Sequence, residues 1–169
     1  MSTPTPTVPI ARHAGEGQAL WFLGSLVTIK ASGEDTGGRM AVIEHLSPRG
    51  SGSPLHVHRN EDEAFYVLDG ELEVWVGEAE LAVPAGRAAF APRDVAHTYR
   101  VTSETARWLA LANSAGFERF VRAVAEPAPA AQIPPAGRRH DAAVLAQLAA
   151  AHGIELLGPP GMLPDGRQV

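Results

Sequence analysis

The stretch GSGSPLHVHRNEDEAFYVLDG, residues 50–70, contains two histidines, an acidic cluster and a glycine at either end. His56 and His58 are two residues apart, so on a β-strand both imidazoles lie on the same face. Glu63 follows five residues after His58 and begins an alternating run that has Phe65 and Val67 on the same face. Two imidazoles and a carboxylate can bind one metal ion if the two strands face a common interior.

A third histidine follows a proline-containing turn further along the chain. His97 opens an apolar segment after Pro92-Arg93-Asp94, and it can reach the same point. An isolated His-x-His pair more often serves a surface or hydrogen-bonding role, but here a complete set of donors is present. Three imidazoles and one carboxylate suit Fe, Mn, Ni, Co, Cu or Zn, whereas Ca and Mg prefer oxygen ligands. We therefore expect one divalent transition metal, bound by His56, His58, Glu63 and His97.

Short apolar segments separated by Gly and Pro surround these residues, a pattern typical of a β-sandwich or barrel. Asp69-Gly70 lies between two alternating runs and predicts a hairpin. Residues 34–38 predict a turn, and the long apolar segment 20–29 predicts one strand with a break at Gly24. The other expected strands are residues 40–46, 63–68, 71–76, 80–83, 88–91, 98–101 and 107–112.

The pattern changes to a helical one after residue 113. Phe117, Phe120 and Val121 share one face of an expected helix, and Asp141 is a suitable N-cap for a second helix that ends near Gly153. Both helices are expected to pack against the barrel or a partner subunit. The expected organisation is a disordered leader (1–15), a β-barrel (16–113) and a C-terminal helical extension with a Pro-rich linker (114–169).

Composition narrows the function classes. The 169 residues include no cysteine, which excludes disulfide scaffolds, Cys-ligated metals and thiol nucleophiles. The net charge of −5 argues against nucleic acid as a partner. The sequence has neither a signal peptide nor an apolar run near the length of a membrane span, so we expect a soluble cytoplasmic protein with no membrane partner.

The histidine-containing stretches resemble the two motifs of the cupin superfamily. The first motif is matched by Gly50, His56, His58, Glu63 and Gly70, and the second by Gly86, Pro92 and His97. Asp94 replaces the usual Gly, and Val101 replaces the usual Asn, without removing a ligand. The resemblance implies an all-β fold, the cupin double-stranded β-helix or jelly-roll barrel, here with C-terminal α-helices.

A narrower resemblance covers the C-terminal part. The Gly116–Phe120 helix, the Pro-rich linker and the final Gly153–Glu155 are similar to bacterial monocupin quercetinase-like proteins. These proteins imply oxidative ring opening of a flavonol by dioxygen, a homodimer, and a base role for Glu63. Physically, the 20–29 strand would be an exposed edge that a second copy can cover.

We therefore hypothesise a metal-dependent dioxygenase acting on a small phenolic or enolic substrate. A non-oxidative metal-dependent isomerase, cyclase or decarboxylase is one alternative, and a small-molecule binding or sensing module is another. Phe117 and Phe120 either close the mouth as a lid or seal the barrel end. Glu61 and Asp62 are expected to be solvated. The candidate pocket residues, for which plain core packing is the alternative, are Phe65, Val67, Phe90, Tyr99, Trp108 and Phe117.

Overall fold

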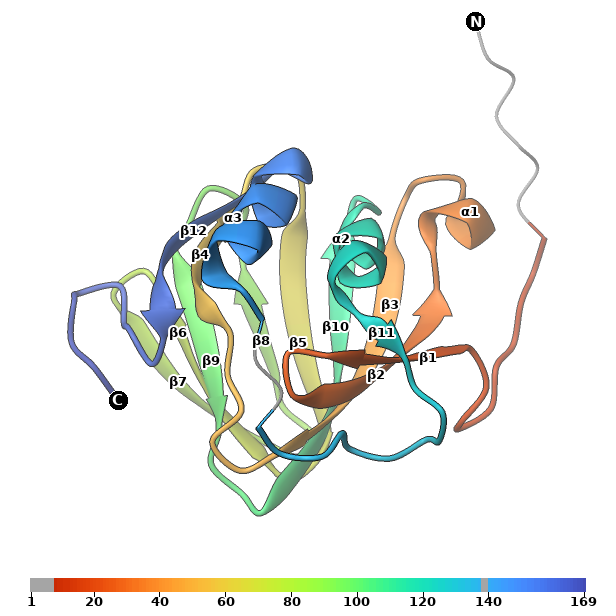
Figure 1. Cartoon of the computed structure of the whole chain (residues 1–169), viewed down its shortest axis with the longest axis horizontal. Coiled ribbons are helices and arrows are strands. Elements are labelled where there is room, and N and C mark those ends of the chain that lie inside the picture. Colours follow the sequence, from red (N-terminus) through yellow and green to blue (C-terminus); the bar gives the residue numbers. More distant parts are fainter. Residues whose placement is uncertain (1–7, 138–139) are drawn as a thin grey trace, which may run out of the picture.

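The computed structural model describes residues 8–137 and 140–169. Two antiparallel sheets pack face to face and confirm the all-β double-sheet fold (Figure 1). The seven-stranded sheet has the order β11 (Glu126–Pro127), β1 (Gln18–Phe22), β2 (Ser25–Ala31), β3 (Ala41–Pro48), β10 (Thr105–Asn113), β5 (Asp62–Asp69) and β8 (Ala88–Ala91). The five-stranded sheet has the order β12 (Ile154–Pro160), β4 (Pro54–His58), β9 (His97–Val101), β6 (Glu71–Val76) and β7 (Ala79–Pro84).

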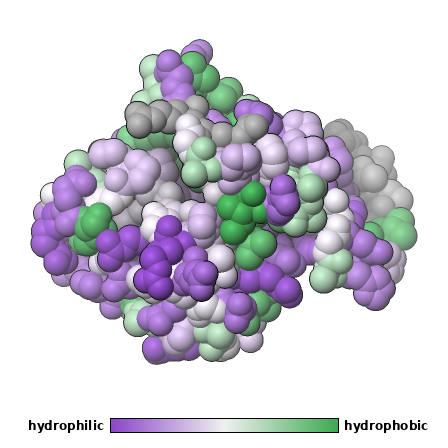
Figure 2. Space-filling model, turned by 60° about the horizontal axis from the view of Figure 1, so that its bottom comes forward, coloured by the Kyte–Doolittle hydropathy of each residue, from purple (hydrophilic) through white to green (hydrophobic). Residues whose placement is uncertain are grey.

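The core lies between the sheets, and strand alternation determines which side chains enter it. In β3, every second residue from Ala41 to Ser47 is buried, and β10 alternates in the same way. The paired register places His45 directly opposite Trp108. The outer surface is mixed: on the face in Figure 2, hydrophobic residues form small groups separated by hydrophilic ones. No described helix is long and apolar enough to cross a membrane.

The Asp69-Gly70 turn differs from the expected hairpin. It joins β5 to β6, which belong to different sheets and do not pair with each other. Gly70 has a φ of +79°, and a Cβ there would collide with the backbone oxygen of Thr105. The close approach of this second backbone explains why glycine is needed at this position. Asp94, which stands where the second cupin motif usually has Gly, has a left-handed backbone with a φ of 64°, a conformation that Asp tolerates better than most residues.

The N-terminal part also differs in detail. The single strand expected over residues 20–29 is a hairpin, because Leu23 and Gly24 both have positive φ and form the two-residue loop between β1 and β2. The expected turn at 34–38 includes a short helix, α1 (Gly33–Thr36), capped by Ser32. β11 pairs with the outer edge of β1, so part of the edge proposed for a dimer is covered by the same chain. The homodimer stays a prediction.

The leader predicted over residues 1–15 falls partly outside the described residues, which begin at residue 8. Within the described part, Arg12 forms an ion pair with Asp35, 3.1 Å away, and donates to the backbone oxygen of Lys30. This stretch is therefore tied to the barrel at Arg12.

The C-terminal segment contains both expected helices and a strand that was missed. α2 (Phe117–Val124) and α3 (Ala142–Ala151) lie at the same end of the barrel (Figure 1), and Asp141 caps α3 as expected. The segment 114–169, expected to be helical, also forms β12, which pairs with β4. Gly158 and two prolines weaken the strand pattern in the sequence, but β12 is an edge strand, where proline is tolerated.

Candidate metal centre and its cavity

Three strands bring four donor side chains to one point between the sheets. His56 and His58 come from β4, His97 from β9 and Glu63 from β5. All four are buried, and their donor atoms lie within 4.8 Å of one another. The structure therefore brings together the complete set that the sequence indicated, which we call the donor cluster.

The donor cluster has the spacing that a small metal ion requires. The Nε2 atoms of His56 and His58 are 3.2 Å apart, and Glu63 Oε2 lies 3.4 Å from His58 Nε2 and 3.2 Å from His97 Nε2. Metal–ligand bonds of about 2.0–2.2 Å separate neighbouring ligand atoms by about 3.0–3.4 Å, depending on whether the geometry is octahedral or tetrahedral. The four residues present therefore fit one transition metal ion.

The other ring nitrogen of each histidine has its own partner. His56 Nδ1 donates to the Pro54 carbonyl oxygen at 2.8 Å, and His97 Nδ1 donates to that of Val95 at 2.9 Å. A carbonyl oxygen only accepts, so each Nδ1 carries the hydrogen and each Nε2 presents a lone pair when the ring is neutral. Lone pairs and a carboxylate directed at one buried point repel each other unless a cation lies between them. This arrangement is typical of metal-binding histidines.

The pKa shifts in the metal-free cluster also indicate that a positive charge is favoured at this point. Burial by itself lowers the pKa of His58, but hydrogen bonds to Glu61 and Glu63 outweigh it and raise that pKa to about 9. Burial, together with the charges of His97 and His58, lowers the pKa of His56 well below its usual value. Burial favours neutral Glu63, but its hydrogen bonds to His58 and His97 hold its pKa well below the usual range. A proton on His58 thus occupies the role that a bound metal ion would take.

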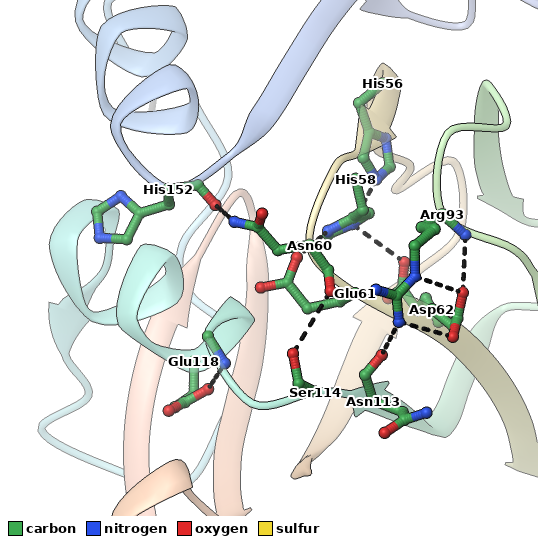
Figure 3. Close-up of polar contacts among 12 residues, drawn as sticks. His56, His58, Asn60, Glu61, Asp62, Arg93, Asn113, Ser114, Glu118 and His152 are labelled. Carbon is green, nitrogen blue, oxygen red and sulfur yellow. Dashed lines mark hydrogen bonds and ion pairs between the residues drawn. The ribbon is translucent and has the colours of Figure 1, made fainter. Parts of the chain in front are cut away.

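Glu61 corrects the expectation of a solvated carboxylate. It is 1% exposed, and its Oε2 lies 3.4 Å from His58 Nδ1 (Figure 3). The start of α2 covers it, because a Cβ at Gly116 would collide with the Glu61 carboxylate. Glu61 is therefore the partner that orients the third histidine, and no local pattern in the sequence marks it as buried.

Asp62, the neighbour of Glu61, is partly exposed and makes a different contact. Arg93 binds both Asp62 carboxylate oxygens, at 3.1 and 3.0 Å, and also reaches the Asn113 carbonyl oxygen at 3.4 Å (Figure 3). These contacts join the start of β5 to the turn before β9. They hold together the strands that supply Glu63 and His97.

A cavity of about 40 Å³ adjoins the donor cluster. His56 and Glu63 line it, together with three of the aromatic residues proposed from the sequence: Tyr99, Trp108 and Phe117. Phe117 also contacts the cluster, since its ring centroid is 5.3 Å from that of His58. The apolar side is lined by side chains of the β1–β2 hairpin, α2, α3 and β12, namely Phe22, Leu23, Phe120, Leu145, Ile154 and Leu156.

The other three proposed pocket residues lie elsewhere. Phe65 and Val67 are fully buried core residues that do not line the cavity. Phe90 is 57% exposed on the outer face, because Ala89 and Ala91 are the inward positions of β8. Period-two reasoning gave the correct face for Phe65 but could not separate the core from the cavity wall.

His45, which belongs to neither of the two histidine motifs, also lines the cavity. Its ring stacks on Trp108 with centroids 4.0 Å apart, and the residue is 2% exposed. Burial lowers the pKa of His45 to about 4, against the opposing charge of Glu63. Among the described residues, neither His45 ring nitrogen nor Trp108 Nε1 has a hydrogen-bond partner.

Comparisons with known proteins agree with the fold. A family model for the cupin domain matches residues 42–112. Quercetin 2,3-dioxygenase from Bacillus subtilis (strain 168) is 28% identical over 134 residues, which cover 79% of this chain. The chain spans 40% of that relative's length.

Solved structures show the same fold at lower identity. An RmlC-like cupin from Shewanella frigidimarina is 18% identical with a TM-score of 0.56, over 66% of this chain and 96% of its own. A predicted oxalate decarboxylase from Thermotoga maritima is 19% identical with a TM-score of 0.57, over 62% and 99%. The polyketide cyclase RemF from Streptomyces resistomycificus is 20% identical with a TM-score of 0.53, over 63% and 80%. These likenesses concern the fold alone.

Proposed function

The protein contains a cupin domain, and from this premise we propose that it is a metal-dependent dioxygenase for small phenolic or enolic substrates. The observation that carries the proposal is the donor cluster at the wall of an aromatic cavity, with every Nδ1 already partnered. The partial match to quercetin 2,3-dioxygenase supports the same reaction class.

His56, His58, Glu63 and His97 would hold the metal ion. When bound, a divalent transition metal supplies a Lewis acid and, if redox-active, exchanges electrons with dioxygen. Glu63 is the only carboxylate of the cluster, and it lines the cavity. It is therefore able to accept the proton of a phenol or enol hydroxyl that enters beside it.

The aromatic residues orient the substrate and exclude water. Tyr99 and Trp108 lie edge to face with ring centroids 4.8 Å apart, and they offer flat walls to a planar ring. Burial, with the charge of Glu63, raises the pKa of Tyr99, so its hydroxyl stays protonated at neutral pH. Phe117 covers His58 from the α2 side. A dry, low-dielectric site strengthens the pull of Glu63 on the substrate proton.

The size of the cavity limits the substrate or requires movement. A cavity of about 40 Å³ has room for roughly three water molecules. An aromatic ring therefore enters only when the apolar side opens, and that side includes Phe117 and Phe120 of α2 and Leu145 of α3. These residues thus act as a movable cover in the proposed reaction.

The experiment is oxygen uptake by protein loaded separately with Fe, Mn, Co, Ni, Cu or Zn. Flavonols, simple phenols and enols are the substrates, and bound metal is quantified in every sample. We expect uptake with at least one metal and one substrate. E63Q is expected to lower uptake per bound metal about 100-fold, the scale of a lost general base. E78Q, at an exposed carboxylate outside the cavity, is the matched control and should match the wild type.

The same samples decide between the alternatives. Substrate conversion without oxygen by the zinc-loaded protein would replace the proposal with a non-oxidative isomerase, cyclase or decarboxylase. Tight binding without conversion under any condition would identify a binding or sensing module.

A further inference from the structure

His45 is a buried titratable group that the proposed reaction does not use. It lies on β3, opposite Trp108 on β10, and the two rings are nearly parallel, at 19°. Both His45 nitrogens and Trp108 Nε1 lack hydrogen-bond partners among the described residues. Buried polar atoms in proteins are nearly always paired, so three unpaired atoms on two touching side chains require an explanation.

Packing does not explain them. A phenylalanine at position 45 would stack on Trp108 equally well and would bury no unpaired nitrogen. The same strand also shows that polar groups facing inward can be paired within the protein. Ser47, the next inward residue of β3, bonds to Ser25 at 2.8 Å.

The pair lies in the same cavity as the donor cluster but in a different part of it. His45 and Trp108 both line that cavity, as do His56 and Glu63. On β10, Trp108 is opposite His45, whereas Ala112, four residues further along, is opposite Glu63. A ligand with one end at Glu63 can therefore have its other end at the His45–Trp108 pair.

The chemistry of the pair selects the group that fits there. The neutral His45 ring offers one N–H donor and one acceptor nitrogen, and Trp108 offers a donor only. A hydroxyl group matches both residues, because it donates to the imidazole nitrogen and accepts from the indole N–H. A carboxylate would leave the acceptor nitrogen unpaired, and an apolar group would leave every atom unpaired.

We propose that His45 and Trp108 form a binding subsite for a second hydroxyl group of the substrate. The inference rests on the proposed function, since it assigns the far end of the same ligand. The substrate class is then a phenol or enol that carries another hydroxyl group away from the metal-binding end. His45 sets specificity and binding orientation, and it takes no part in the proton transfer at Glu63.

The test uses two ligands that differ by one hydroxyl group, 3-hydroxyflavone and its 4′-hydroxylated derivative. Their dissociation constants are measured by calorimetry on zinc-loaded wild type, H45F and H45N. We expect the wild type to bind the hydroxylated ligand about tenfold more tightly, the scale of one buried hydrogen bond. H45F should bind both ligands equally, and H45N, which retains a donor and an acceptor, should recover part of the difference.

Two results would overturn the subsite. The first is an H45F variant that keeps the full wild-type preference for the hydroxylated ligand. The second is a wild type with no such preference, whether it binds both ligands equally or binds neither. Zinc content and circular dichroism are measured on each variant to show that the fold and the donor cluster are intact. Oxygen uptake is a separate measurement, so loss of the subsite with uptake retained would refute only this inference. A wild-type preference for the hydroxylated ligand without oxygen uptake would refute the proposed dioxygenase activity and leave the subsite in place.

Discussion

The donor cluster and the His45–Trp108 pair face one cavity, but their side-chain nitrogens differ in whether they have hydrogen-bond partners within the protein. Each histidine of the cluster has a protein partner at Nδ1: Pro54, Val95 or Glu61. The His45–Trp108 pair has no partner for any of its nitrogens among the described residues. Hydrogen bonds within the protein fix the orientation of the cluster's imidazole rings before a ligand binds. The unpaired nitrogens of His45 and Trp108 gain hydrogen-bond partners only when a ligand binds. The difference separates a site that is organised in advance from one that its ligand completes.

The largest effect is expected from breaking the donor cluster itself. H56A removes one of four ligands, and we expect metal affinity to fall at least 1000-fold, so the purified variant retains almost no metal. His58, Glu63 and His97 remain, so the variant still folds around three of the four donors. Metal content by mass spectrometry after dialysis is the measurement. H13A, at an exposed histidine, is the control, and metal retained by H56A would contradict the ligand role.

The second largest effect is expected at His45, and it is a pH-dependent change in the free energy of unfolding. The pKa of His45 is about 4 in the folded protein against an ordinary value near 6.5, so the unfolded chain binds more protons between these values. Its contribution to stability is complete above pH 6.5 and is lost as the pH falls to 4, by about 3 kcal/mol. H45F has no such group and should lose less stability over this window. Urea unfolding at pH 7, 5.5 and 4.5 measures it; parallel pH curves for both proteins would refute the assignment.

The smallest effect is expected from the partner of His58. E61Q keeps an acceptor for His58 Nδ1 but removes the charge, and we expect metal affinity to fall about 10- to 100-fold. The same change lowers the pKa of His58, because Glu61 is one of the groups that raise it. Competition with a chelator gives the affinity, and proton NMR of the metal-free protein gives the pKa. E78Q is again the control. An E61Q variant with wild-type affinity would show that Glu61 only fills space.

The sequence allowed prediction of the donor cluster because its information is local. Two histidines in one strand must share a face, and Glu63 begins the next strand after a short loop. The alternation of apolar residues likewise indicated most of the strands of both sheets. These features depend on spacing along the chain, which needs no knowledge of which strands pair.

The remaining features depend on contacts between distant segments. Glu61 is buried by α2, more than fifty residues later, so its acidic neighbours in sequence suggested the wrong environment. In β3 both faces are apolar, and only the pairing with β10 shows that His45 faces the cavity. Strand β12 was missed because its prolines weaken the strand pattern. Its partner, β4, also lies far earlier in the chain, before most of the other barrel strands.

β12 has a consequence for the order in which the chain acquires its metal site. β4 carries His56 and His58, and in the five-stranded sheet it pairs with β12 on one side and β9 on the other. Arg59, next to His58, also binds Glu155 of β12, 96 residues further along the chain. During synthesis, His56, His58, Glu63 and His97 all leave the ribosome before the strand that encloses β4 has been made. The strand that carries two of the four donors therefore gains its second neighbour in the sheet only after residues 154–160 have been translated.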